Sequence, residues 1–538
     1  MTTEQVLSEF IHAHTSLIEP LNREAALAEW DLQTTSSEEA QNLSEELNKR
    51  IAMIYANPDE YALLKSIDAA QISDPLLRRQ HELLLLEYAG SQMSAEAIDE
   101  IVTLEVSIAE KFNSFRPIDP SDADGQKLLS DNEIDDVLLE SLDSDTRKAV
   151  WLASKQIGCN TAESVIELVR LRNREAKKLG FADYYQMSLT LQEQDCETLF
   201  GLLERLEAEC TDVWNNYRAG LEASLRTRFG LSAQQPVQPW HHANRFFQEP
   251  GSGEANLDRF FEGKELEPIS AGFFAAIGMP IEDLLTKADL YEREGKCQHA
   301  FCLDADRLGD VRVLCNLRSD ERWMSTLLHE YGHAVYDKFT DHNLPYLLRG
   351  PAHTLTTEAI ALLMGRFTKS ANWLAAWAGA DPAEAERIAA AAQRELTAYF
   401  LVFMRWCFVM CYFERELYSN PDQDLDALWW SLTQRFQGVS CPPEDRQPGM
   451  WAAKIHIATA PVYYHNYLLG EMAASQLLNY LQNTVLNGDA KALVSSAKVG
   501  EWMCAELFEP GATRPWQQWL HHATGEELNP RYFVGQLK

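Results

Sequence analysis

The stretch "TLLHEYGHAVYDKF", residues Thr326–Phe339, places two histidines four residues apart and a glutamate directly after the first. Apolar residues recur through and before it at helical spacing, which predicts an amphipathic helix that begins near Ser319. One turn of helix separates His329 from His333, so their side chains stack on the same face. The apolar residues that mark the other face are Met324, Leu327, Leu328, Tyr331 and Val335.

Two imidazoles one turn apart can both bind one Zn²⁺ ion, and Glu330 is then placed to act as a base towards a water at the metal. The alternative is a solvated polar helix face, because a motif this short also arises by chance. A catalytic zinc site needs three protein ligands and an open position, so a third ligand distinguishes the two interpretations.

The chain after the motif restricts the choice of this ligand. Between Asp341 and Asp381 there is one carboxylate, Glu358, which can return on an adjacent helix. His353 is the alternative, although we expect it in the connection just ahead of that helix. Phe339 stands where the metzincin pattern would place its third histidine, which excludes that class.

Composition limits the partners. The chain has 538 residues, of which 47 are basic and 81 acidic, giving a net charge of −34. This charge opposes binding to nucleic acid or to an anionic membrane and favours neutral or basic partners.

The N-terminus lacks the pattern of a secretory signal, so we expect a cytoplasmic protein. The longest apolar run, 398–413, is too short to span a bilayer and carries Arg405, which predicts a buried core helix.

The order of these patterns predicts a mainly α fold with one catalytic unit. Helical spacing dominates residues 1–233, which we interpret as an N-terminal helical subdomain. A Pro/Gly-rich passage at 234–260 is expected to be a cleft loop or linker. Residues 261–538 form the predicted catalytic subdomain. Within it, "QHAFCLD" and "VRVLCNL", joined by the turn-prone "ADRLGD", predict a small β-hairpin beside the motif helix.

Several segments together resemble the angiotensin-converting-enzyme family of zinc dipeptidyl carboxypeptidases. They are "HEYGHAVYDKF", "HTLTTEAIALL", "WWSLTQRFQGVSCPP" and "KIHIATAPVYYHNYLLGE". The more distant thimet oligopeptidase and oligoendopeptidase F families share the zinc motif and the position of the glutamate ligand. The resemblance implies one zinc ion per chain, bound by His329, His333 and Glu358, with Glu330 as general base. It also implies a large helical body, of the zincin type with a glutamate ligand (gluzincin), split by a deep channel that admits short unfolded peptides.

The last of these segments carries further implied roles. Tyr467, helped by His456, would donate to the oxyanion of the transition state. Lys454 and Tyr464 would bind the substrate, with Tyr463 as the alternative to Tyr464. An aromatic core stripe is the competing interpretation of this segment.

The histidine-alanine pair at His299 and Ala300 matches an edge strand that lies beside the substrate in the family. Backbone pairing with an extended peptide is the physical reason for such a strand.

The expected function is therefore zinc-dependent hydrolysis of short peptides, with release of C-terminal dipeptides. An oligoendopeptidase without C-terminal anchoring is the alternative, since the glutamine that helps to hold the substrate carboxylate in the family is missing from Arg259–Leu266, where we expect it. An inactive relative that binds zinc and peptides is a further alternative. The sequence does not indicate the oligomeric state.

Overall fold

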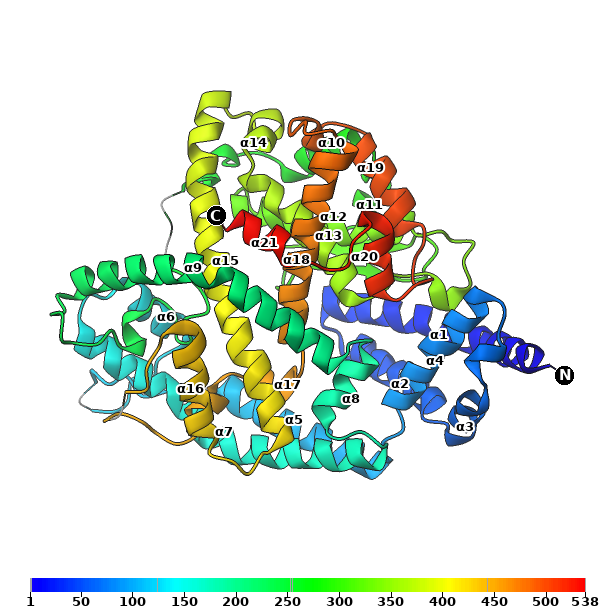
Figure 1. Cartoon of the computed structure of the whole chain (residues 1–538), viewed down its shortest axis with the longest axis horizontal. Helices are drawn as coiled ribbons and strands as arrows, with labels where there is room; N and C mark the ends of the chain where they lie inside the picture. Colours follow the sequence, from blue (N-terminus) through cyan, green and yellow to red (C-terminus); the bar gives the residue numbers. More distant parts are fainter. Residues whose placement is uncertain (1, 123, 252, 254, 443, 538) are drawn as a thin grey trace. The chain divides into compact units, whose positions relative to one another are not determined.

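The computed structural model describes residues 2–122, 124–251, 253, 255–442 and 444–537. The chain is mainly helical, with one two-stranded sheet among the described residues (Figure 1), so the predicted fold class of helices with a small β-hairpin is confirmed. The chain forms two compact units, each made of separate stretches. Unit 1 comprises Met1–Gln92, Ala255–Gln393 and Leu469–Phe533, and unit 2 comprises Met93–Glu254, Arg394–Leu468 and Val534–Lys538.

Each unit has its own set of elements. Unit 1 holds α1 (Thr3–Thr35), α2 (Glu38–Tyr55), α3 (Pro58–Ser66), α4 (Pro75–Gly90), α10 (Leu266–Ala276), α11 (Glu282–Leu285), β1 (Phe301–Asp304), β2 (Val311–Leu314), α12 (Glu321–Phe339), α13 (Thr354–Gly365), α14 (Ala371–Trp377), α19 (Lys498–Met503) and α20 (Trp516–Thr524). Unit 2 holds α5 (Ala95–Ser114), α6 (Asp131–Glu140), α7 (Ser144–Lys178), α8 (Tyr184–Leu191), α9 (Cys196–Phe229), α16 (Leu425–Gln437) and α17 (His456–Thr459). The division falls inside α15 (Pro382–Ser419), α18 (Tyr464–Tyr480) and α21 (Arg531–Gln536). The predicted subdomain boundaries at 233 and 260 stay a prediction.

Helix α15 contains the long apolar run. Among the described residues it is the one helix long and apolar enough to cross a membrane by length and composition, and 72% of its apolar window is buried. Arg405, within the run, is 3% exposed and its guanidinium lies 5.3 Å from the ring centre of Trp214, which belongs to the same unit. An arginine stacked on an aromatic ring and surrounded by packed side chains fits the predicted core helix.

The motif helix, α12, begins where the sequence predicts. Asp320 is its N-cap and accepts a hydrogen bond from the backbone N–H of Trp323 at 2.8 Å. The predicted apolar face is fully buried, and each leucine in it contributes about 1.5–3 kcal/mol to stability. α12 packs closely on α13, and Gly332 makes this approach possible. A Cβ atom at residue 332 would lie 2.8 Å from the Cα atom of Ala361.

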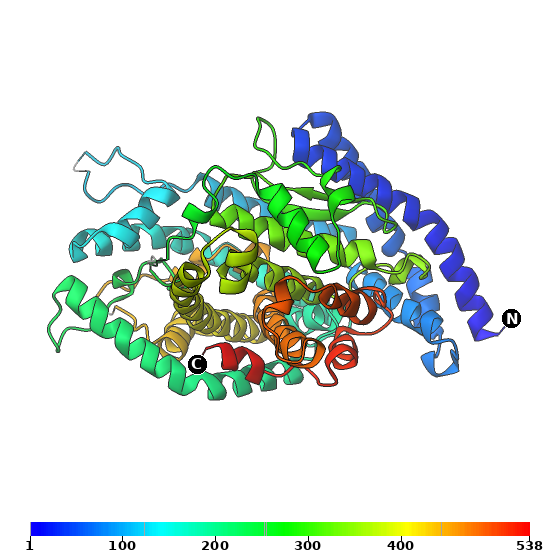
Figure 2. The same cartoon turned by 90° about the horizontal axis from the view of Figure 1, so that it is seen from above.

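The hairpin lies between α1 and α12, as Figure 2 shows. Its strands are antiparallel, with Phe301 opposite Leu314 and Asp304 opposite Val311. The ring of Trp30 from α1 meets Phe301 edge to face, with 6.0 Å between ring centres. The hairpin is thus fixed against the motif helix as well as against α1.

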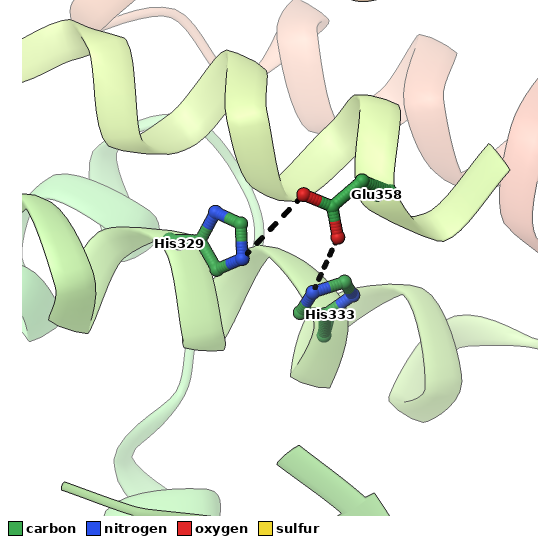
Figure 3. A group of neighbouring side chains, drawn as sticks. All are labelled: His329, His333 and Glu358. Atoms are coloured by element: carbon green, nitrogen blue, oxygen red, sulfur yellow. Dashed lines mark ion pairs between the residues drawn. The ribbon is translucent and has the colours of Figure 1, made fainter. Parts of the chain in front are cut away.

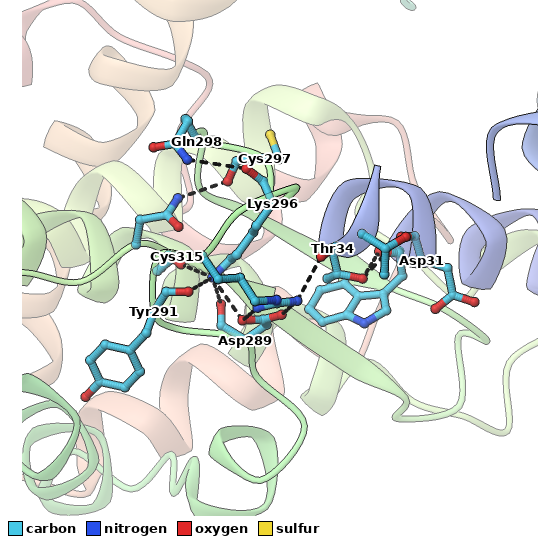
Figure 4. Close-up of polar contacts among 12 residues, drawn as sticks. Asp31, Thr34, Asp289, Tyr291, Lys296, Cys297, Gln298 and Cys315 are labelled. Atoms are coloured by element: carbon cyan, nitrogen blue, oxygen red, sulfur yellow. Dashed lines mark hydrogen bonds and ion pairs between the residues drawn. The ribbon is translucent and has the colours of Figure 1, made fainter. Parts of the chain in front are cut away.

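A buried lysine fixes the segment that leads into β1 (Figure 4). The ammonium group of Lys296 donates to the carbonyl oxygens of Asp289 at 3.0 Å, Tyr291 at 2.8 Å and Cys315 at 2.5 Å. It also forms an ion pair with Oδ1 of Asp289 at 2.9 Å. The charge is therefore fully satisfied inside the protein, and it joins the loop to the end of β2.

The same loop is also attached to the end of α1. Arg293 donates to the carbonyl oxygen of Thr34 at 2.9 Å, and the N–H of Cys297 donates to the carbonyl oxygen of Gln33 at 2.8 Å. Residues 289–297 are consequently attached both to the end of α1 and to the end of β2. This segment ends two residues before His299.

Candidate metal centre

Three predicted ligands converge in unit 1 (Figure 3). His329 and His333 project from α12, and Glu358 projects towards them from α13. The Nε2 atom of His329 lies 4.0 Å from Oε1 of Glu358, and that of His333 lies 3.6 Å from Oε2. One ligand atom from each residue lies within 4.8 Å of the other two. Among the described residues, these three side chains form the one group of histidine, cysteine or acidic residues that could hold a metal ion.

Burial sets the protonation of the two histidines. Loss of solvent lowers the pKa of His329 to about 4 and that of His333 to about 3, the latter also because His329 is near. Both imidazoles are therefore neutral near pH 7 and can offer a lone pair to a metal. Burial raises the pKa of Glu358 to about 7, because its carboxylate has no water to stabilise its charge. A divalent cation would supply that stabilisation.

The donor set fits zinc. Two imidazole nitrogens and one carboxylate oxygen are ligands that zinc accepts in catalytic sites with an open fourth position. Ligand atoms about 2.0–2.1 Å from a tetrahedral ion lie ~3.3 Å apart. The two histidine nitrogens lie 4.0 and 3.6 Å from different oxygens of Glu358, and one ligand atom from each residue lies within 4.8 Å of the others, so a small movement of the side chains would bring them to an ion.

Glu330 follows the first ligand on α12. Its side chain is 7% exposed. Burial, and then the charge of Glu358, raises the pKa of Glu330 to about 8. A carboxylate that holds a proton this strongly is suited to exchange protons near neutral pH.

His353, the alternative third ligand, has another role. It is the N-cap of α13, and its Nδ1 atom accepts a hydrogen bond from the backbone N–H of Leu355 at 3.0 Å. It does not belong to the cluster that the three other side chains form among the described residues.

His299 and Ala300 come directly before β1, whose hairpin packs on α12. β2 covers one edge of β1, and no described strand pairs with its other edge. His299 and Ala300 therefore lie just outside the predicted strand and lead into it, and among the described residues the second edge of that strand pairs with no other strand. Their role in binding substrate stays a prediction.

The remaining predicted residues cluster in unit 2. Ring centres of His456 and Tyr464 are 5.4 Å apart, and those of Tyr464 and Tyr467 are 5.5 Å apart. Burial lowers the pKa of His456 to about 4, so this ring is neutral near pH 7. Tyr464 is 3% exposed, whereas Tyr463 and Tyr467 are partly exposed. The assignment of Tyr464 rather than Tyr463 to substrate binding stays a prediction.

Lys454 has a partner that the sequence did not suggest. Its Nζ atom donates to Oε1 of Gln248 at 2.8 Å. Burial, and then the charge of Arg245, lowers the pKa of Lys454 to about 8. Gln248 lies in the Pro/Gly-rich passage, 11 residues before Arg259, where the segment expected to hold a glutamine begins. No spacing rule links residues 248 and 454, which are 206 positions apart.

Comparison with known proteins relates the chain to two peptidase families. The model of peptidase family M3 matches residues 284–538, and that of angiotensin-converting enzyme matches residues 1–239. The angiotensin-converting enzyme-like protein Ace3 of Mus musculus is 21% identical over 92% of this chain and 71% of its own length. The angiotensin-converting enzyme of Haematobia irritans exigua is 22% identical over 84% and 79%. Carboxypeptidase 1 of Bacillus subtilis is 25% identical over 75% and 85%.

Both families contain peptidases, and the motif helix and Glu358 fall inside the M3 match. Together with the two-histidine, one-glutamate cluster, these matches support a metallopeptidase.

Proposed function

We propose that this chain, which resembles the angiotensin-converting enzymes and the M3 peptidases, is a zinc peptidase that releases C-terminal dipeptides from short unfolded peptides. The observation that carries the proposal is the convergence of His329, His333 and Glu358, with Glu330 beside them. A digest of a mixed peptide library, analysed by mass spectrometry, tests it. Products two residues long, each from the C-terminus, are expected.

Zinc bound by the three ligands would supply Lewis acidity, to water as well as to the scissile carbonyl group. Glu330 takes the proton that the attacking water loses. It then gives that proton to the departing amine, so that the amine leaves as a neutral group. Burial raises the pKa of Glu330 in the metal-free site, and a bound cation beside it would favour the carboxylate form that takes the proton.

The oxyanion that develops on the carbonyl oxygen needs donors aimed at it. We assign this role to the hydroxyl group of Tyr467, helped by His456. A neutral imidazole carries one N–H that can donate, and the low pKa of His456 keeps it neutral near pH 7. Tyr467 is partly exposed, as a group that contacts substrate must be.

Replacing Tyr467 with phenylalanine should lower kcat by about 10²–10³-fold with little change in KM, because the hydroxyl acts mainly in the transition state. Steady-state kinetics on one peptide measures both constants. Tyr464→Phe, one turn earlier on α18, is the comparison variant, because Tyr464 is assigned to substrate binding and its loss should act mainly on KM. A loss confined to KM would give Tyr467 a binding role, and a large kcat loss in Tyr464→Phe would move the donor to Tyr464.

The pair of Lys454 and Gln248 supports anchoring of a substrate carboxylate. An ammonium group and an amide N–H₂ can both donate to the two oxygens of a carboxylate. Lys454 Nζ also lies 5.9 Å from the ring centre of Tyr464, which is the third predicted member of this subsite. The glutamine that is missing from 259–266 is thus available from residue 248.

A peptide with a free C-terminus should be cleaved about ten- to a hundredfold more efficiently, in kcat/KM, than its C-terminally amidated form. One charged hydrogen bond of roughly 1.5–3 kcal/mol accounts for this preference. Lys454→Ala should remove most of the preference, and Gln248→Ala should reduce it. Lys148→Ala, in the same unit and paired with Asp445 at 2.8 Å, is the matched control.

The oligoendopeptidase remains the second candidate, because the M3 family also matches the chain. It predicts equal cleavage of free and amidated peptides, with cuts at several places along longer chains. An inactive zinc- and peptide-binding relative predicts about one zinc per chain and no products.

A further inference from the structure

The ring of His333 is held from outside the metal cluster. Its Nδ1 atom lies 2.7 Å from the hydroxyl oxygen of Thr357, which is on α13. Its other nitrogen, Nε2, faces Glu358 at 3.6 Å. The two nitrogens of one imidazole thus face a hydroxyl group and the metal cluster respectively.

This arrangement selects a tautomer when a metal is bound. A metal ligand must present a bare nitrogen, so the proton of neutral His333 then resides on Nδ1. Nδ1–H donates to the oxygen of Thr357, and a hydroxyl oxygen accepts this bond readily. Valine has nearly the same shape as threonine but cannot accept it.

Within the described parts of the chain, His329 lacks an equivalent support. Among the described residues, no side chain forms a hydrogen bond with either of its ring nitrogens. A neighbouring side chain therefore sets the orientation of the His333 ring but not that of the His329 ring. Thr357 also directly precedes Glu358. One turn of α13 therefore supplies the ligand Glu358 and also the hydroxyl group that contacts the ligand His333.

We propose that Thr357 is a positioning residue of the metal centre. Its hydroxyl group accepts the Nδ1–H of His333 and holds Nε2 towards the ion. The inference rests on the proposed zinc site. In many zinc proteins a carboxylate or a backbone carbonyl group accepts the second N–H of a ligand histidine, and here a hydroxyl group fills that role.

Zinc affinity of the whole protein, measured by competition with a chromogenic chelator, tests the inference without any peptide. Thr357→Val should bind zinc about 10–100-fold more weakly than wild type. Thr357→Ser, which keeps the hydroxyl group, should stay close to wild type. Thr354→Val, an exposed threonine in the first turn of the same helix, is the control and should bind zinc as wild type does.

A second measurement separates positioning from general loosening of the fold. Nitrogen-15 spectra of the zinc-loaded protein, labelled at histidine, should show one slowly exchanging Nδ1–H that is present in Thr357→Ser and lost or fast in Thr357→Val. A substitution that merely disturbs packing would weaken binding in both variants alike.

Wild-type zinc affinity in Thr357→Val, with an unchanged Nδ1–H signal, would overturn the inference and leave the proposed function intact. Equal weakening in the valine and serine variants would also overturn it. A wild-type protein that binds no zinc would overturn the proposed function, and this inference with it.

Discussion

Replacing Glu330 with glutamine should lower kcat by about 10⁴-fold while the protein keeps about one zinc ion per chain. Glutamine has nearly the same size but cannot take or give a proton, so both transfers assigned to Glu330 are lost. The ligands are unchanged, and removal of a buried carboxylate whose pKa is already raised leaves no unpaired charge. Peptide hydrolysis and metal content, measured on one preparation, test this result.

Two further variants make the experiment specific. Glu321→Gln is the control at the start of the same helix, where the carboxylate pairs with Lys369 at 3.1 Å and lies outside the cluster. It should leave hydrolysis nearly unchanged. Glu358→Gln should instead lose zinc, because an amide oxygen is a weaker ligand for zinc than a carboxylate. Full activity in the Glu330 variant would rule out the proposed mechanism.

Replacing Lys296 with methionine should lower the free energy of unfolding by about 2–6 kcal/mol, because two buried carbonyl oxygens lose their donor at about 1–3 kcal/mol each. The variant removes a buried ammonium group that satisfies three carbonyl oxygens and the carboxylate of Asp289. Methionine fills a similar volume but donates nothing, so the carbonyl oxygens of Tyr291 and Cys315 lose their donor. Asp289 keeps its contacts with Arg293 and with the backbone N–H of Cys315. Unfolding in urea, followed by circular dichroism, measures the change.

Lys287→Met is the matched control, since its side chain is 42% exposed and its ion pair with Asp310 is 3.4 Å long. A loss below about 1 kcal/mol is expected there. At temperatures where the Lys296 variant is still folded, KM should rise more than kcat falls, because residues 289–297 set the position of His299 and Ala300. Equal stability of the two variants would show that the buried network contributes little.

Local features were predictable from the sequence. The helix that carries His329 and His333 follows from the spacing of its apolar residues, and the hairpin follows from two short apolar segments around a turn. Glu358 could be predicted as a candidate because it is the one carboxylate in a 39-residue interval between Asp341 and Asp381. Each of these inferences needs only neighbouring residues.

Features that depend on distant residues were not predictable. Lys296 stands between charged and polar residues and has the sequence surroundings of a surface lysine, yet the fold buries it among carbonyl groups. Gln248 is paired with Lys454 across 206 positions, and its own neighbours indicate only a loop. Thr357 has no signal beyond its place before a ligand. In each case the partner is decided by tertiary packing, which periodicity does not encode.

The interleaving of the two units along the chain limits how this protein can be made. The metal centre lies in a unit that needs residues from before position 92 and from after position 469. During synthesis from the N-terminus, the first helices must therefore wait until the residues after 469 have left the ribosome before their unit can close. For the same reason, a shorter protein that keeps only the metal-binding unit could not be obtained by trimming the ends of the chain. It would have to be made by joining three separate stretches with new linkers.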